Sequence, residues 1–388
     1  MNSYLKTYPW LTFRLDLRQA KPRFWILLGE ALSKCEHISG VPLRPATAKE
    51  LHNVYLAKGI MATTAIEGNT LTESEVRARI EGALPLPPSK EYLGQEVDNI
   101  LEACHEIASR LFSPGYSEKI TIEQIKNYNR LVLKKLPLSS EVIPGEIRKH
   151  AVGVGQYRCP TPAECKTLLE KLCVFLNEDF QGSDLPRMAY SILKAIMAHL
   201  YLAWIHPFGD GNGRTARLLE FEILLAAGTP TPAAHLLSNH YNATRHEYYR
   251  LLDYASRSGG DVMPFLDYAI QGFVDGLREQ LAIIREQQHD VAWRNYIHEL
   301  FKDKTRKTNV RRRQLALDLS QINEPTPVSK IRRLSPRLAE YYAQKSPIVI
   351  LRDIDDLIRM GLVEKTKEGI RAKREIILSF LPQTRRDT

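Results

Sequence analysis

The chain has 388 residues, of which 44% are hydrophobic and 26% charged, as in ordinary folded globular proteins. This composition argues against a disordered, collagen-like or coiled-coil chain, and the length allows two or three domains. The apolar runs Leu168–Leu176 and Leu218–Ala227 are shorter than the roughly 18 residues needed to span a bilayer. The first residues lack a signal-peptide pattern, and the five cysteines lack the spacing of a zinc or disulfide framework. We therefore expect a cytoplasmic protein with reduced cysteines and no membrane contact.

The net charge of +9 is unevenly distributed along the chain. Residues 301–388 contain 21 Lys and Arg against 11 Asp and Glu, whereas residues 1–300 contain 33 against 34. The basic character therefore belongs to a C-terminal module, and it indicates a polyanionic partner for that module alone.

In chain order, the first 120 residues show apolar residues at helical spacing, with a proline-rich break at Leu84–Pro88. Residues 121–287 continue this pattern except for one alternating segment, Arg148–Tyr157, which predicts a small β-hairpin. A polar helix over Arg278–Lys302 then leads into the basic part. We predict a mainly α protein with an N-terminal helical region (1–120), a core (121–287), and a linker helix followed by a basic domain (288–388).

The basic domain ends in a helix, a glycine and two strand-like segments. Residues 350–360 have helical spacing, and Gly361 is typical of a helix end. Residues 363–372 and 375–378 predict two strands around a turn. This order resembles a winged helix-turn-helix, in which the helix enters the major groove of DNA and the ribbon contacts phosphates. A winged helix used only for protein contacts is the alternative, which Asp353, Asp355 and Asp356 favour.

The segment 206–217, HPFGDGNGRTAR, combines chemical groups that core packing does not require. It lies between two helical patterns, so we expect a loop that opens onto a helix N-terminus, where glycines let backbone N–H groups point at a phosphate. Arg214 and Arg217 are three residues apart and suit phosphate oxygens, and Asn212 can donate to another. Asp210 suits Mg²⁺, and His206 suits a general base at neutral pH. The combination predicts attack of a hydroxyl on a phosphoryl group.

This segment resembles the signature of the Fic family, HPFx(D/E)GN(G/K)RxxR, at every specified position. The resemblance implies a helical core with a β-hairpin flap, and transfer of AMP from ATP to a Ser, Thr or Tyr hydroxyl of a target protein. It implies that His206 is the base and that Asp210 holds the metal. The phosphate cradle would consist of Gly211, Asn212, Gly213, Arg214 and Arg217.

Further segments match the family. Thr63, Glu67 and Gly68 resemble the (S/T)xxxE(G/N) inhibitory motif, on a predicted helix at about 50–68, in which Glu67 would pair with Arg217 and misalign ATP. The flap would present its edge to an extended target segment. Tyr248 resembles an aromatic contact to adenine, and Ser256 stands where relatives often have Asn, which puts base selectivity in doubt. The resemblance thus implies this nucleotide-binding set: Glu67, Val152, Gly153, Val154, Gly155, Asp210, Gly211, Asn212, Gly213, Arg214, Thr215, Ala216, Arg217, Tyr248 and Ser256.

Three functions follow from these patterns. The first is an auto-inhibited AMP transferase that uses ATP and Mg²⁺. The second is a hydrolase that removes AMP from a modified protein, with Glu67 activating water. The third is a DNA-binding regulator whose Fic body senses nucleotide. Family members often pair through helical surfaces, so a homodimer is also an expectation.

Overall fold

The computed structural model describes residues 4–82, 85–114, 116, 119–155, 157–178, 185–322 and 324–378. The chain divides into two compact units, Met1–Leu281 and Ala282–Thr388. The division falls inside one continuous helix, α12 (Met263–Leu300), and a few residues before the boundary predicted between residues 287 and 288. The predicted N-terminal region and core therefore lie in one unit, because their apolar residues share one buried cluster.

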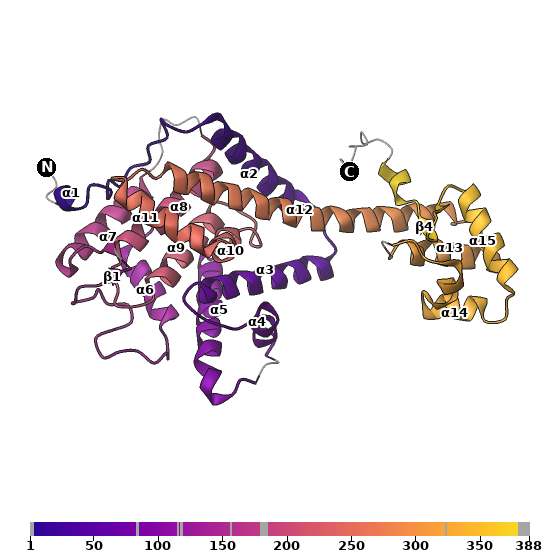
Figure 1. Ribbon diagram of the computed structural model, residues 1–388, viewed down its shortest axis with the longest axis horizontal. Helices are drawn as coiled ribbons and strands as arrows, with labels where there is room; N and C mark the ends of the chain where they lie inside the picture. The colour runs from indigo at the N-terminus through magenta and orange to yellow at the C-terminus, as the bar shows by residue number, and fades with distance from the viewer. Residues whose placement is uncertain are drawn as a thin grey trace. The chain divides into compact units, whose positions relative to one another are not determined.

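The first unit is a helical body with one small hairpin (Figure 1). Before α12 its described elements are α1 (Tyr4–Thr7), α2 (Pro22–Gly40), α3 (Pro45–Ala65), α4 (Glu73–Ile80), α5 (Glu91–Leu111), α6 (Ile122–Val132), β1 (Gly153–Val154), β2 (Tyr157–Arg158), α7 (Pro162–Asn177), α8 (Arg187–Ile205), α9 (Asn212–Ala226), α10 (Leu236–Ala243) and α11 (Arg245–Arg257), with a 3₁₀ turn at Pro88–Lys90.

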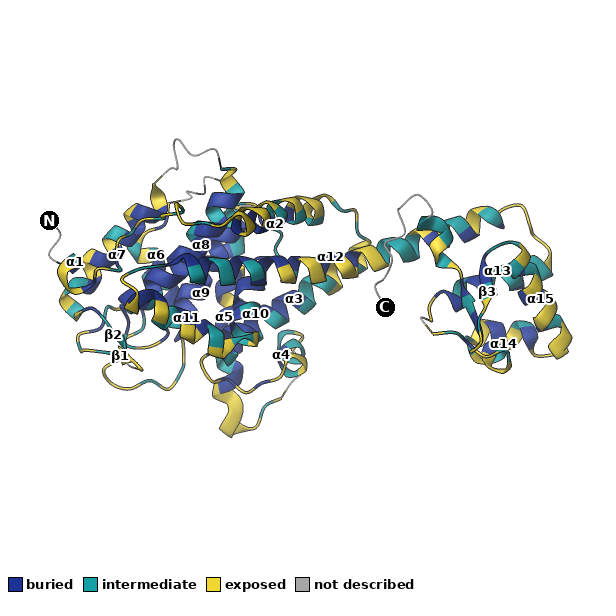
Figure 2. Ribbon diagram, turned by 45° about the horizontal axis from the view of Figure 1, so that its top comes forward, coloured by how far each residue is buried: buried dark blue, intermediate teal, exposed yellow. Residues whose placement is uncertain are grey.

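Helix α8 forms the centre of this unit, packed against α9 and α7, and it is largely dark blue in Figure 2. It is also long and apolar enough to cross a membrane by length and composition, and 78% of that apolar stretch is buried inside the protein. It is not one of the two apolar runs named from the sequence, Leu168–Leu176 and Leu218–Ala227. A helix enclosed by neighbours on most sides is apolar all round, which accounts for its composition.

Two predicted boundaries shift by a few residues. Helix α3 ends at Ala65, so Glu67 lies in the turn after the helix and not on it. Gly68 closes that turn at a φ of 106°, which a side-chain-bearing residue rarely adopts. Helix α9 begins at Asn212, so only the first half of the 206–217 segment is a loop.

The predicted hairpin is present but short. β1 and β2 pair antiparallel, with Gly153 opposite Arg158 and Val154 opposite Tyr157. Just before it, Ile147 forms an isolated antiparallel bridge with Phe208. The hairpin is therefore attached at its base to the loop that follows α8.

The second unit has its own core around the C-terminal part of α12. Its elements are α13 (Lys307–Leu319), a 3₁₀ segment (Val328–Arg333), α14 (Pro336–Tyr342), α15 (Pro347–Arg359), β3 (Val363–Lys365), β4 (Ile370–Ala372) and a second 3₁₀ segment (Arg374–Leu378).

The predicted strand at residues 375–378 was wrong, because that segment is 3₁₀ helix. The hairpin closes earlier, with Val363 opposite Ala372, and the other edge of β4 is occupied by Thr326, which exchanges both backbone hydrogen bonds with Ile370. The helix end at Gly361, with a φ of 74°, follows the prediction.

Candidate active site

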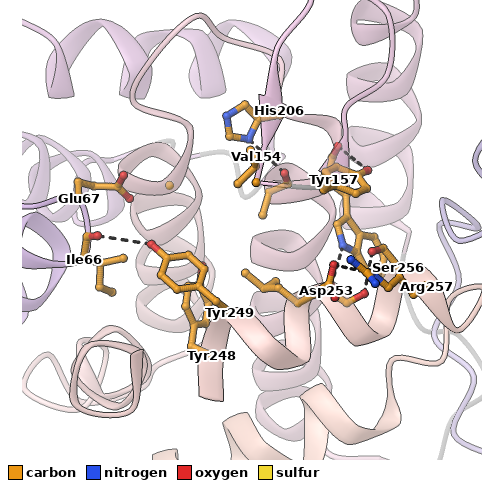
Figure 3. Close-up of a pocket in the computed structure, with 15 residues that line it drawn as sticks. Ile66, Glu67, Val154, Tyr157, His206, Tyr248, Tyr249, Asp253, Ser256 and Arg257 are labelled. Carbon is orange, nitrogen blue, oxygen red and sulfur yellow. Dashed lines mark hydrogen bonds and ion pairs between the residues drawn. The ribbon is translucent and has the colours of Figure 1, made fainter. Parts of the chain in front are cut away.

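A cavity of about 610 Å³ lies where five segments of the first unit meet. The turn after α3 contributes Glu67, the flap contributes Val154, the end of α8 contributes His206, the start of α9 contributes Gly213, and α11 contributes Tyr248 with its neighbours (Figure 3). These segments are far apart in sequence, so the fold assembles the cavity.

His206 is the C-cap residue of α8, and its backbone is left-handed, with φ 48° and ψ 58°. Its Nδ1 lies 3.3 Å from the carbonyl oxygen of Ala203. A carbonyl only accepts, so Nδ1 carries the proton and Nε2 remains a free base. Burial lowers the pKa of His206, an effect that outweighs the opposing influence of Glu67 and Asp210. The imidazole is therefore neutral at neutral pH.

The loop between α8 and α9 is closed by amide side chains. Asn212 accepts from the backbone N–H of Phe208 and donates to the carbonyl of Phe208, both at 2.9 Å. From α6, the buried Asn129 donates to the carbonyl of Asp210 at 2.8 Å and accepts from the backbone of Gly145 at 2.9 Å. The Asn212 side chain is thus used inside the loop, which leaves its backbone N–H for a phosphate. No motif in the sequence marked Asn129 as a residue of this site.

Glycines keep the N-terminus of α9 open. Gly211 has a φ of 76°, and a β-carbon on it would lie 3.0 Å from the Asn129 amide. A β-carbon on Gly213 would lie 2.2 Å from Oε1 of Glu67. The carboxylate of Glu67 therefore lies directly over the helix N-terminus, the position that an anion would take.

Glu67 also holds the second arginine of the cradle. Its Oε1 accepts from Nη2 of Arg217 at 2.6 Å, and the same nitrogen donates to the carbonyl of Thr63 at 3.0 Å. The Arg217 side chain is 1% exposed, and its Nε and Nη1 have no hydrogen-bond partner among the described residues. Burial alone raises the pKa of Glu67, but Arg217 reverses the shift and leaves this pKa below its ordinary value.

Arg214, the first arginine of the cradle, pairs with Glu96, which was not predicted from the sequence. Nη1 of Arg214 donates to Oε1 of Glu96 at 2.8 Å, and Nη2 lies 3.4 Å from Asp210. Burial raises the pKa of Glu96, and Arg214 offsets this only in part. Glu96 lies on α5, 118 positions before Arg214, and no local pattern marked it.

The aromatic end of the cavity is formed by α11. Tyr248 lines the cavity with its ring, while its hydroxyl contacts Nε2 of His199 in the core at 2.8 Å. Ser256 lines the cavity too, but its hydroxyl donates to the carbonyl of Asp253 at 2.9 Å. Asp253 and Arg257, which form an ion pair at 2.9 Å beside Ser256, were not predicted as site residues.

Some predicted residues lie behind the cavity. Thr215 and Ala216 are fully buried, and Thr215 donates to the carbonyl of Gly211 at 2.8 Å. Val152 and Gly153 precede the part of the flap that lines the cavity, which is Val154 and Gly155. Thr63 is buried and acts through its carbonyl on Arg217, and Gly68 shapes the turn.

Asp210 is the carboxylate available for a metal. Its side chain is half exposed, and Oδ1 accepts from the backbone N–H of Gly211. Among the described residues, no group of three or more His, Cys, Asp or Glu is arranged to hold a metal ion. A single carboxylate fits Mg²⁺ that takes its other oxygens from phosphates and water, so the site suits the metal only together with a nucleotide.

Part of this chain is similar to a known protein family. Residues 119–224 match the model of the Fic/DOC family, so the chain contains a Fic domain. It is 36% identical over 210 residues to "Protein adenylyltransferase Fic" of Nematostella vectensis, and 34% identical over 206 residues to "Protein adenylyltransferase fic-1" of Caenorhabditis elegans. These matches cover 54% and 53% of this chain but only 45% and 37% of the relatives.

Solved structures extend the likeness in fold. A structure of Fic-1 from C. elegans, residues 134–508, aligns with a TM-score of 0.54 and 25% identity over 68% of this chain and 73% of that one. A Fic family protein from Desulfovibrio desulfuricans aligns with a TM-score of 0.57 over 91% of this chain and 94% of that one, at 20% identity. The second match concerns the fold alone.

Proposed function

We propose that the chain is an auto-inhibited protein AMPylase, which transfers AMP from ATP to a Ser, Thr or Tyr hydroxyl of a target protein. One observation carries the proposal: a single cavity joins a neutral histidine, the glycine-rich N-terminus of α9 and an aromatic wall. The curated relatives named above are adenylyltransferases, which supports ATP as the nucleotide.

In this proposal, Nε2 of His206 accepts the proton of the target hydroxyl as the oxygen attacks the α-phosphorus and pyrophosphate leaves. The backbone N–H groups at the start of α9, with Arg214 and Arg217, hold the phosphates by charge-assisted hydrogen bonds. Mg²⁺, when bound at Asp210 with the nucleotide, would supply charge neutralisation. An extended target segment would pair with the flap edge near Val154, which is 42% exposed.

Glu67 would keep this enzyme inactive. Its carboxylate covers the N-terminus of α9 and engages Arg217, so a triphosphate would have to displace it to bind in line. Misalignment of the phosphates removes most of what a protein contributes to phosphoryl transfer, so the contact is a sufficient block.

Removal of AMP from a modified protein is the second direction. Glu67 lines the same cavity as His206 and is ionised, so its carboxylate is placed to activate water. Incubation of an AMP-modified protein with the wild type and with Glu67→Gln separates the two directions, since only a hydrolase releases AMP in a Glu67-dependent way.

The decisive experiment is intact mass after incubation with Mg²⁺ and each nucleoside triphosphate. The wild type, Glu67→Gly and Glu67→Gly/His206→Ala are compared. We expect only Glu67→Gly to gain a nucleoside monophosphate, preferentially AMP. Modification of the double variant would remove His206 from the proposed role, and modification of the wild type to the same extent would remove Glu67.

We also propose that the second unit binds DNA as a winged helix. The acids of α15 argued against this role, but Asp353 is 1% exposed and accepts from Arg311 at 2.6 Å, Arg312 at 2.8 Å and Tyr342 at 3.0 Å. This carboxylate is part of the core and unavailable to a partner. Cations remain exposed on and around α15 and the hairpin, including Lys345, Arg352, Lys365, Lys367 and Lys373.

A cytoplasmic location fits this proposal. All five cysteines are free thiols and four of them are buried, as expected in a reducing compartment.

A further inference from the structure

The Glu96 carboxylate connects two parts of the proposed active site. One oxygen, Oε1, accepts from Nη1 of Arg214 at 2.8 Å. The other, Oε2, accepts from Nδ2 of Asn69 at 2.8 Å, and Asn69 belongs to the turn that carries Glu67. Asn69 is itself buried and also donates to the carbonyl of Leu93 at 3.0 Å.

Glu96 differs from Glu67 in its position relative to the cavity. Glu67 lines the cavity and lies against Gly213, where it would compete with a phosphate. Neither Glu96 nor its partner Arg214 is among the described residues that line this cavity. Glu96 pairs with the Arg214 guanidinium, with side chains 15% and 5% exposed respectively, whereas it is Glu67 that lies against Gly213 at the anion position.

The second end of the same guanidinium faces Asp210 at 3.4 Å, which leaves Arg214 held between two acids. A long side chain held in this way loses little conformational entropy when a ligand arrives. Through Asn69, the turn that carries Glu67 is anchored to the same Glu96 carboxylate that pairs with Arg214.

We propose that Glu96 is a positioning residue that orients Arg214 for the phosphates of the nucleotide and anchors the inhibitory turn through Asn69. This inference rests on the proposed function, since it assigns Glu96 a role toward the same nucleotide. It predicts a loss of affinity for the phosphates and not for the nucleoside.

The test measures nucleotide binding by calorimetry in the full chain carrying Glu67→Gly and His206→Ala, which binds without transfer. Adding Glu96→Gln should weaken ATP binding about tenfold, because Arg214 loses its fixed orientation. Adenosine, which has no phosphate, should bind within twofold of the parent. Glu96→Asp keeps the charge on a shorter chain and should give an intermediate ATP affinity.

Glu102→Gln is the matched control, since Glu102 lies on the same helix and pairs with Lys134 at 2.6 Å outside the cavity. It should leave ATP binding unchanged. Equal or tighter ATP binding by the Glu96→Gln variant would overturn the proposal, as would an equal loss for adenosine, which marks a merely structural role. A parent that binds no ATP would overturn the proposed function itself, so the two failures are distinguishable.

Discussion

His206 combines an unusual backbone with a shifted acid–base equilibrium. Its left-handed conformation directs the imidazole out of the line of α8, and the Ala203 carbonyl fixes the tautomer that exposes Nε2. Because burial lowers its pKa below the ordinary value of 6.5, the neutral base persists at pH values where an exposed histidine would be protonated.

The pH profile should therefore show where His206 titrates. In Glu67→Gly, kcat/KM for self-modification should fall on acidification with a midpoint below pH 6.5. Removing Glu67 moves the His206 pKa in the same direction, since that carboxylate favours protonation. Rates measured between pH 5 and 8 give the midpoint, and a midpoint above 6.5 would contradict the assignment of His206 as a buried neutral base.

The residues of this site differ in how far sequence could predict them. His206, Asp210 and the two arginines stand within twelve positions, so their chemistry was readable together. Glu67 was readable only from a motif resemblance. Glu96 and Asn129 were not, because each reaches the site from another helix and acts through a contact that exists only after folding.

At the scale of elements, Arg148 fastens the flap to the loop between α8 and α9. Its side chain is buried, and its partners among the described residues are three backbone carbonyls: those of His206 at 2.8 Å, His150 at 2.8 Å and Pro160 at 2.5 Å. Its backbone N–H donates to the Pro207 carbonyl at 3.0 Å. The planar fork of an arginine meets three divergent acceptors that a lysine cannot reach together.

Arg148→Lys should therefore impair both stability and catalysis. We expect a loss of about 2 kcal/mol in unfolding free energy, from unsatisfied buried carbonyls, and at least a tenfold lower kcat in the Glu67→Gly background. Binding of ATP should change less, because the Arg148 side chain bonds to backbone carbonyls and to none of the groups proposed to hold the phosphates. Arg158→Lys, on the exposed face of β2, is the control, and an equally active Arg148→Lys would show that the flap holds its position without this side chain.

Helix α15 shows how a charge pattern misleads when burial is unknown. Its three aspartates suggested an acidic surface, yet the buried Asp353 forms ion pairs with Arg311 and Arg312 inside the second unit. Helical spacing could predict the element and Gly361 its end. Helical spacing could not show that Arg311 and Arg312 of α13 pair with Asp353 of α15.

Asp353→Asn should destabilise the second unit by about 3 kcal/mol, because it leaves a buried guanidinium without its charge partner. Thermal unfolding should then show a separate early transition, about 10 °C or more below the unfolding midpoint of the protein without this substitution. Self-modification by the Glu67→Gly form should persist, since Asp353 lies outside the first unit. Asp355→Asn removes the same charge from an exposed position and should leave the midpoint within a few degrees, so equal effects of both variants would contradict the buried role.

At the scale of the whole chain, two units with different charge share one helix. The composition predicted a separate basic module and put its boundary only a few residues after the division, although α12 is continuous across it. The apolar residues of α12 up to Leu277 belong to the first core and those from Trp293 on to the second, and the polar run at residues 285–290 between them is the sequence signal of the change.

Binding of the second unit to DNA should be recognisable by its salt dependence. Each phosphate contact releases a counterion, so the logarithm of affinity should fall linearly with the logarithm of salt concentration. The double variant Lys365→Ala/Lys367→Ala removes two exposed hairpin cations and should reduce that slope by about two. Lys49→Ala/Lys135→Ala removes two exposed cations of the first unit and should leave the slope unchanged. Fluorescence anisotropy with a duplex between 50 and 300 mM salt measures both slopes. An affinity independent of salt, or equal slopes in the two double variants, would exclude phosphate contacts by the hairpin and favour the protein-binding alternative for this unit.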